Sequence, residues 1–168
     1  MILLLATLIF VPMLFELWLS QRNERELRAM GSVEPEGDVY LLMQVAYPFI
    51  FLAILAAAWL RPVPVDTLVA AGFAIFIGAK VLKYWAILSL GVRWTFRVLV
   101  PPGSTPLTLG PYRILRHPNY AAVMGEIAGA ATIAHAPVVG AATLAVFGIL
   151  ILMRIRIEER ALGFRQSS

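Results

Sequence analysis

Cysteine is absent from this chain of 168 residues, which excludes disulfide bonds, thiolate metal ligands and cysteine nucleophiles. Charged residues are scarce, at 14% of the chain against about 25% in an average soluble domain. Hydrophobic residues reach 60%, and the mean hydropathy is +0.81. These values exclude a water-soluble globular protein and make the lipid bilayer the expected environment. No metal site is expected.

The length limits the architecture to one small bundle. A membrane-spanning helix needs about 20 apolar residues, which leaves room for four or five spans and for no separate soluble domain. We therefore predict an all-α integral membrane protein with a single domain, residues 1–168, and about five spans. The last two apolar runs have 16 residues each, so either flanking residues extend them or they form a short tilted hairpin. The five runs are Met1–Leu19, Leu41–Leu60, Thr67–Leu90, Tyr120–His135 and Val138–Met153.

Basic residues are distributed unevenly between the connections. Gln21–Tyr40, Gly91–Asn119 and the tail from Arg154 hold three, four and four arginines, whereas the other side of the bundle holds only Arg61. The positive-inside rule places the arginine-rich segments in the cytoplasm and the N-terminus outside. Contact with anionic lipid then accounts for the net charge of +4, and nucleic-acid binding is not expected.

Four charged residues fall inside the predicted spans, where charge is costly and indicates function by default. Glu16, Lys80 and Lys83 lie near the inner ends of their spans, from which their side chains can snorkel to the interface. Glu126 lies about two turns inside its span and is the candidate for lining a polar cavity. His135, beside the outer turn, is expected to be interfacial.

Small residues recur at helical spacing in the third and fourth spans. Such faces let helix backbones approach closely in lipid, so packing is their expected role, within one chain or between two. The oligomeric state therefore stays open. The two faces consist of Ala70, Ala74 and Gly78, and of Ala121, Gly125 and Gly129.

The segment Gly110–Tyr120 (GPYRILRHPNY) leads directly into the fourth span. Pro118 suits a first helical turn, and the free N–H groups of that turn carry partial positive charge. With Arg113 and Arg116 they can bind a carboxylate or phosphate, and two tyrosines of the segment could cover a flat ring. The alternative is that these arginines only contact lipid headgroups.

Two adjacent glutamates, Glu158 and Glu159, follow the last span. They lie at helical pairing distance from Arg154 and Arg156, so a solvated helix is one interpretation. The other is that the glutamates bind a cationic or polyhydroxyl group. The helix start and the acidic pair would then hold opposite ends of one zwitterion.

These two segments resemble the isoprenylcysteine carboxyl methyltransferase family and its phospholipid methyltransferase relatives. The family pattern is G-P-Y-R, then R-H-P-x-Y-x-G, a spanning hairpin and an E-E pair, with Ala122 replacing the last glycine here. The resemblance covers about Leu90 to Leu162, and the first three spans match mainly in hydropathy. The matching elements are Gly110–Arg113, Arg116–Tyr120 and Glu158-Glu159.

The resemblance implies a methyltransferase that uses S-adenosylmethionine and releases S-adenosylhomocysteine. It also implies a lipophilic acceptor that enters from the bilayer and meets the cofactor at the cytoplasmic surface. Glu126 is the candidate base for an acceptor hydroxyl, and Arg154 could instead position an anionic head. By the family pattern, cofactor binding falls on Tyr112, Arg116, His117, Pro118, Tyr120, Glu158 and Glu159.

The acceptor itself stays open between several lipids. Segments such as Val33–Tyr40 and Gly91–Thr95 resemble a bacterial branch whose members methylate hydroxyl groups of alkylpyrones or alkylresorcinols. This favours a lipidic hydroxyl over a prenylcysteine carboxylate, in a bacterial cytoplasmic membrane, and a phospholipid acceptor stays open. Two other functions remain as alternatives: a small proton-coupled multidrug exporter that uses Glu16, and an assembly protein without a ligand.

Overall fold

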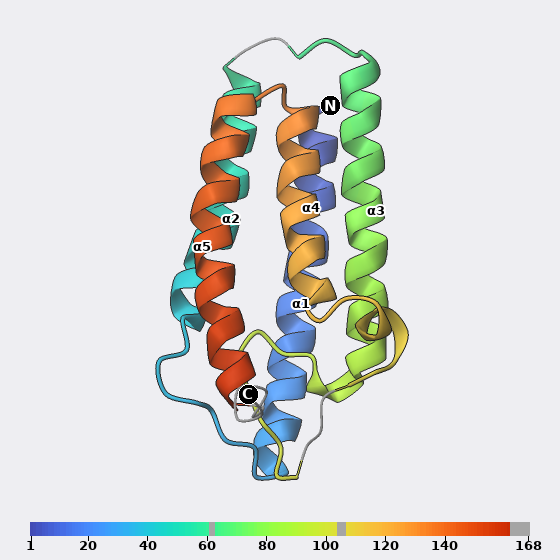
Figure 1. The fold of residues 1–168 in the computed structure, drawn as a ribbon. Coiled ribbons are helices and arrows are strands. Elements are labelled where there is room, and N and C mark those ends of the chain that lie inside the picture. The colour runs from blue at the N-terminus through green and yellow to red at the C-terminus, as the bar shows by residue number, and fades with distance from the viewer. Residues whose placement is uncertain (61–62, 104–106, 162–168) are drawn as a thin grey trace.

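The computed structural model describes residues 1–60, 63–103 and 107–161. Over these residues the chain forms five α-helices that stand side by side in one bundle (Figure 1), which confirms the predicted all-α membrane fold. Two short 3-10 turns interrupt the connection between the third and fourth helices. The elements are α1 (Ile2–Ala29), α2 (Tyr40–Trp59), α3 (Thr67–Leu90), η1 (Gly91–Arg93), η2 (Gly110–Arg113), α4 (Pro118–Ile133) and α5 (Pro137–Ala161).

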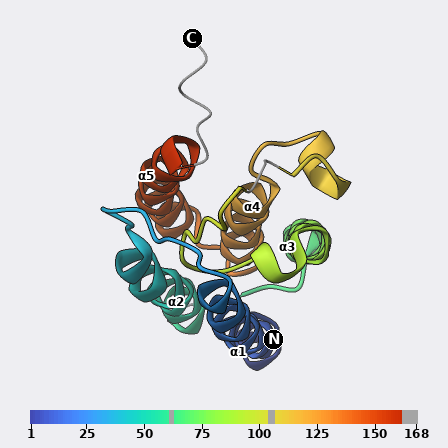
Figure 2. The same cartoon turned by 90° about the horizontal axis from the view of Figure 1, so that it is seen from below.

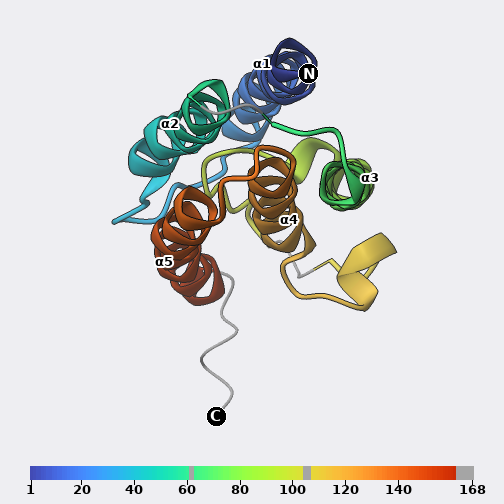
Figure 3. The same cartoon turned by 90° about the horizontal axis from the view of Figure 1, so that it is seen from above.

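Four helices, α1, α2, α3 and α5, are long and apolar enough to cross a membrane. The fifth predicted span corresponds to α4, whose 16 residues extend about 24 Å, less than the hydrocarbon core of about 30 Å. Helix α4 lies between α3 and α5, with α1 and α2 together on one side of it (Figures 2 and 3). All five predicted spans are helices in the structure, and a spanning role for the shorter α4 stays a prediction.

The helices continue beyond their apolar runs at the lower end of the bundle in Figure 1. The first predicted span ended at Leu19, but α1 runs on to Ala29. The last ended at Met153, but α5 continues without a break to Ala161. The polar tail is thus the end of a spanning helix, and this end carries the candidate site.

Close contact between α3 and α4 depends on glycine. A Cβ atom on Gly129 would lie 2.7 Å from the backbone nitrogen of Phe76, and one on Gly72 would lie 2.7 Å from that of Ile133. Both distances are too short for any side chain, so the two backbones touch directly. This contact fixes the position of α4, whose first turn belongs to the candidate site.

Of the two small-residue faces predicted from the sequence, one is packed in the structure and the other is exposed. The face on α4 packs as expected, since Gly125 and Gly129 both meet α3. The face of Ala70, Ala74 and Gly78 is exposed, and a Cβ on Gly78 would meet nothing within 4 Å. Of the two predicted ways of packing, only packing between two chains stays open for this second face, because α3 turns Gly72 toward α4 instead.

The connection after α3 is tied to the lower part of α1. The side-chain amide of Asn23 donates to the carbonyl oxygen of Trp94 at 2.8 Å, and the N–H of Phe96 donates to the Ser20 hydroxyl at 2.8 Å. An isolated antiparallel bridge joins Val33 to Val100. These bonds hold the segment beneath the bundle, where it reaches the polar end of α5.

Candidate functional site

The first turn of α4 is positioned by the η2 turn before it. Gly110 has a φ of +57°, and a Cβ there would lie 2.1 Å from the Ser89 hydroxyl oxygen, so only glycine fits against α3. Helix α4 begins at Pro118 with His117 as its N-cap, as predicted. The N–H groups of Asn119 and Tyr120 therefore have no acceptor within the helix and point toward the N-terminal end.

The acidic pair on α5 lies against this helix start. The Nδ1 atom of His117 is 3.6 Å from Glu158 Oε2, and its Nε2 atom is 3.4 Å from Glu159 Oε1. The Tyr120 hydroxyl donates to Glu158, and the Tyr120 ring stacks on His117 at a centroid distance of 5.7 Å. The structure thus brings together the two motifs that the sequence placed about 40 residues apart.

The remaining predicted cofactor residues surround the same point. Arg116 Nη1 lies 3.6 Å from Glu159 Oε1, and Pro118 is fully buried beneath the helix start. Burial raises the pKa of the Tyr112 phenol, and the nearby negative charge of Glu158 raises it further. Tyr112 is therefore neutral at physiological pH and presents an uncharged aromatic ring next to the carboxylates.

The histidine between the two carboxylates is shifted toward its charged form. The hydrogen bond from His117 to Glu158 raises the pKa of the imidazole above its usual value, and partial burial opposes this only in part. The negative charge of Glu159 acts in the same direction as that of Glu158. The acidic pair therefore favours a cationic partner, and His117 is that partner in this structure.

Arg154 on α5 connects the site to the surrounding loops. Its Nε donates to the Tyr120 hydroxyl at 3.2 Å, and its Nη1 donates to Asp38 Oδ1 at 2.9 Å. Its Nη2 donates to the carbonyl oxygen of Phe96. Because the side chain is only 5% exposed, Arg154 is a buried junction between α4, α5 and both lower connections.

A second polar cluster lies deeper in the bundle. Glu16, Lys80, Lys83 and Glu126 form what we call the buried quartet, in which each ammonium group contacts both carboxylates at 2.6–3.3 Å. The Tyr47 hydroxyl donates to Glu126 Oε2 at 2.5 Å. The quartet joins α1, α3 and α4, and its formal charges cancel.

The buried quartet changes the interpretation of its members. Glu16, Lys80 and Lys83 were expected to snorkel, but each is buried and paired within the bundle, so that prediction was wrong. Glu126 is buried as expected, but its neighbours are two lysines and Tyr47. An acceptor hydroxyl would have to displace one of them to reach Glu126, and the role of base stays a prediction.

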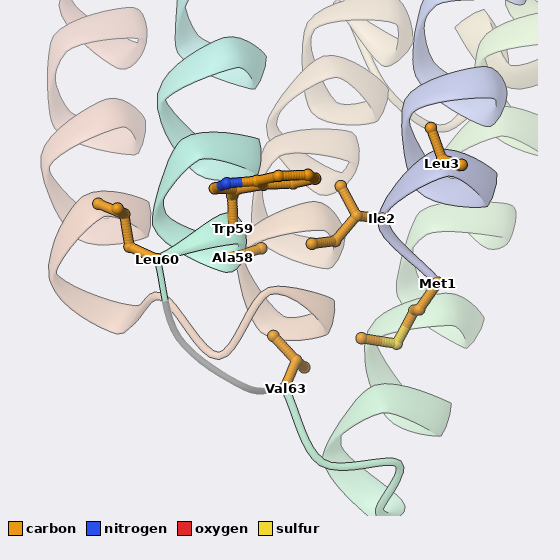
Figure 4. A pocket seen from close by; sticks show the side chains of 7 residues that line it. All are labelled: Met1, Ile2, Leu3, Ala58, Trp59, Leu60 and Val63. Atoms are coloured by element: carbon orange, nitrogen blue, oxygen red, sulfur yellow. The ribbon is translucent and has the colours of Figure 1, made fainter.

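A cavity lies at the other end of the bundle (Figure 4). It has a volume of about 600 Å³ between the start of α1 and the end of α2. The described residues that line it are apolar, so they offer none of the charged groups that surround the candidate site. The lining residues are Met1, Ile2, Leu3, Ala58, Trp59, Leu60 and Val63.

Sequence reasoning missed two residues of these clusters. Asp38 lies in a connection with several charged neighbours, and nothing in the local pattern marks it as the partner of Arg154. Tyr47 is one aromatic residue among many in an apolar helix. A polar hydroxyl on the residue directly before Pro48, where the helix loses a backbone hydrogen bond, is the weak signal that could have singled it out.

Comparison with known proteins matches the region that holds this site to a known family. The sequence model of the isoprenylcysteine carboxyl methyltransferase (ICMT) family matches residues 70–163, which include the start of α4 and the acidic pair. The chain belongs to this family. It is 29% identical over 163 residues to the uncharacterised protein YpbQ of Bacillus subtilis, with 95% of both chains covered. It is 24% identical over 150 residues to an uncharacterised protein of Haemophilus influenzae, covering 89% of this chain and 87% of that one. No solved structure matches.

Family membership identifies a membrane-associated methyltransferase. The names of the two relatives add no substrate, and neither the comparisons nor the structure supports the exporter alternative. In particular, Glu16 contacts two lysine ammonium groups at 2.6 Å and 3.3 Å, so its carboxylate is already neutralised within the bundle.

Proposed function

We propose that this protein transfers a methyl group from S-adenosylmethionine to an oxygen of a lipophilic acceptor at the cytoplasmic membrane surface. The observation that carries the proposal is the meeting of the α4 helix start with the acidic pair, through His117, Tyr120 and Glu158. The proposal takes residues 1–168 as one transmembrane methyltransferase domain. It also places the lower end of the bundle in Figure 1 in the cytoplasm.

The chemistry of the residues present fits the cofactor. S-adenosylmethionine carries a carboxylate, an ammonium group, a hydroxyl-bearing ribose and a flat adenine ring, and it supplies an electrophilic methyl group on a sulfonium. The free N–H groups at the start of α4 and Arg116 suit the carboxylate. Glu158 and Glu159 suit the ammonium or the ribose hydroxyls, while Tyr112 and the stacked rings of His117 and Tyr120 suit the adenine.

The acceptor is proposed to be a lipid with a hydroxyl or carboxylate head, such as an alkylpyrone, an alkylresorcinol or a prenylcysteine. The helices keep its chain in lipid while its head meets the cofactor beside Arg154. Arg154 holds Tyr120 in place and is proposed to orient the acceptor head, and Glu126 is retained as the candidate base. Because a sulfonium is already a strong electrophile, alignment and exclusion of water are the protein's main contributions.

The decisive experiment is calorimetric titration of the purified full-length protein with S-adenosylhomocysteine. We expect saturable binding that weakens by about tenfold or more in His117→Ala and in Glu159→Ala, as expected for the loss of one charged hydrogen bond. Glu26→Gln is the matched control, because Glu26 is an exposed carboxylate on the same end of the bundle. Absence of binding at millimolar ligand would overturn the proposed function. Full affinity in both site variants would overturn the site.

A further inference from the structure

Each nitrogen of the Arg154 guanidinium already donates to an acceptor of the protein. Arginine recognises carboxylates with its paired N–H groups, and this is how such a residue would hold an acidic acceptor head. Here Nη1 donates to Asp38 at 2.9 Å, Nη2 donates to the Phe96 carbonyl oxygen, and Nε donates to Tyr120. The protein therefore supplies its own carboxylate at the position that an acidic acceptor would need.

Asp38 is held firmly in this position by the backbone. Its Oδ1 atom accepts from the N–H of Tyr40 at 3.1 Å, and its Oδ2 atom accepts from the N–H of Val98 at 3.0 Å. The side chain is 5% exposed, as is that of Arg154. An acceptor carboxylate could displace Asp38 only by leaving a buried carboxylate without its cation, which is strongly unfavourable.

The ion pair of Arg154 and Asp38 lies directly beside the proposed cofactor site. Arg154 Nε is 3.2 Å from the Tyr120 hydroxyl and 3.6 Å from Glu158 Oε1. An acceptor oxygen that reaches the methyl group must approach the same residues. There it meets three carboxylates, Asp38, Glu158 and Glu159, and a further negative charge would be repelled.

We propose that Asp38 is a specificity-determining residue that excludes carboxylate acceptors and selects hydroxyl acceptors. This inference rests on the proposed function and names a residue within it. A hydroxyl head brings no charge into the acidic surroundings. It can also donate a hydrogen bond to Asp38 Oδ2, since a carboxylate oxygen has two lone pairs and Val98 uses one of them.

The test uses two acceptors that differ only in the head group: a long-chain para-alkylphenol and the para-alkylbenzoic acid of the same chain length. Labelled methyl transfer from S-adenosylmethionine is measured for both with the full chain in lipid nanodiscs. We expect the wild-type kcat/KM for the phenol to exceed that for the acid by about tenfold or more. In Asp38→Asn the ratio shifts toward the acid by a similar factor, because Arg154 gains capacity for an external carboxylate.

Glu34→Gln is the matched control in the same connection. Its carboxylate pairs with Arg97 at 2.6 Å and with Arg28 at 2.6 Å, so we expect its acceptor ratio to stay at the wild-type value. An equal loss of methyl transfer to the phenol and to the acid in Asp38→Asn would indicate that the Asp38–Arg154 pair is only structural, and it would overturn the inference. The ratio of the wild-type kcat/KM values for phenol and acid tests the inference without relying on the folding of any variant. A wild-type preference for the acid, or transfer to neither acceptor, also overturns the inference. If S-adenosylhomocysteine still binds, the failure concerns Asp38 alone; if it does not, the proposed function fails.

Discussion

The ammonium nitrogen of Lys83 lies 2.6 Å from Glu16 Oε2, which joins α3 to α1 in the interior of the bundle. Lys80 makes a parallel contact with Glu16 at 3.3 Å, and both lysines also reach Glu126 on α4. In lipid there is no hydrophobic driving force between helices, so close packing and polar contacts must drive their association. The buried quartet is therefore the specific link that positions α1 against the helices of the candidate site.

Replacing one lysine of the buried quartet should destabilise the bundle. Lys83→Met leaves two buried carboxylates with one cation, and breaking a buried ion pair in this way costs about 3–5 kcal/mol. Thermal unfolding in a fixed detergent measures the effect. Val81→Met on the exposed side of the same helix is the control and should leave the melting temperature nearly unchanged.

A second variant separates charge imbalance from lost packing. Lys83→Met combined with Glu16→Gln leaves one lysine and one glutamate, so the charges balance again. We expect the double variant to recover much of the stability that Lys83→Met alone loses. A double variant that is less stable than either single variant would contradict the charge-balance explanation.

The sequence predicts the helices well and their rotations poorly. The limits of α2 and α3 and the start of α4 at Pro118 agree with the apolar runs and with the helix-start signals. The contact of His117 with the acidic pair follows from motif order. The buried quartet cannot be predicted from the sequence in this way, because each spanning helix is apolar on almost every side. Without an amphipathic stripe, nothing in the pattern shows which face of α1 turns Glu16 inward. The partner of Arg154 was missed for a similar reason, since the path of a loop decides it.

Two glycines on neighbouring helices should respond oppositely to alanine. Gly129→Ala places a Cβ 2.7 Å from a backbone atom of α3, which forces the helices apart and costs about 1–3 kcal/mol. Gly78→Ala meets nothing within 4 Å, and alanine favours the helix by about 0.5–1 kcal/mol. Melting temperatures of the two variants check the prediction. Equal destabilisation by both would indicate that the face around Gly78 packs against a second copy.

The contribution of His117 to stability should depend on pH. Contact with Glu158 raises the pKa of His117, so the charged pair stabilises the fold fully below the unfolded value of about 6.5. That contribution disappears as the pH rises through the folded-state pKa. Since the side chain is 20% exposed, we expect about 0.2–1 kcal/mol. The stability difference between wild type and His117→Gln should therefore shrink between pH 5.5 and pH 8.5. His135→Gln, at the other end of the bundle, is the control and should keep the pH dependence of stability that arises from His117. A stability difference between wild type and His117→Gln that grows with pH would contradict the prediction.

The orientation of the bundle can be tested cleanly because the chain has no cysteine of its own. Glu36 lies on the arginine-rich end and Val65 on the opposite end, and both are exposed. The positive-inside rule places Glu36 in the cytoplasm. In intact cells, a membrane-impermeant maleimide should label Val65→Cys but label Glu36→Cys only after the membrane is opened. The reverse pattern would place the proposed cofactor site outside the cell, away from cytoplasmic S-adenosylmethionine, and would contradict the proposed function together with the orientation. Labelling of both variants from outside would instead indicate insertion in two orientations.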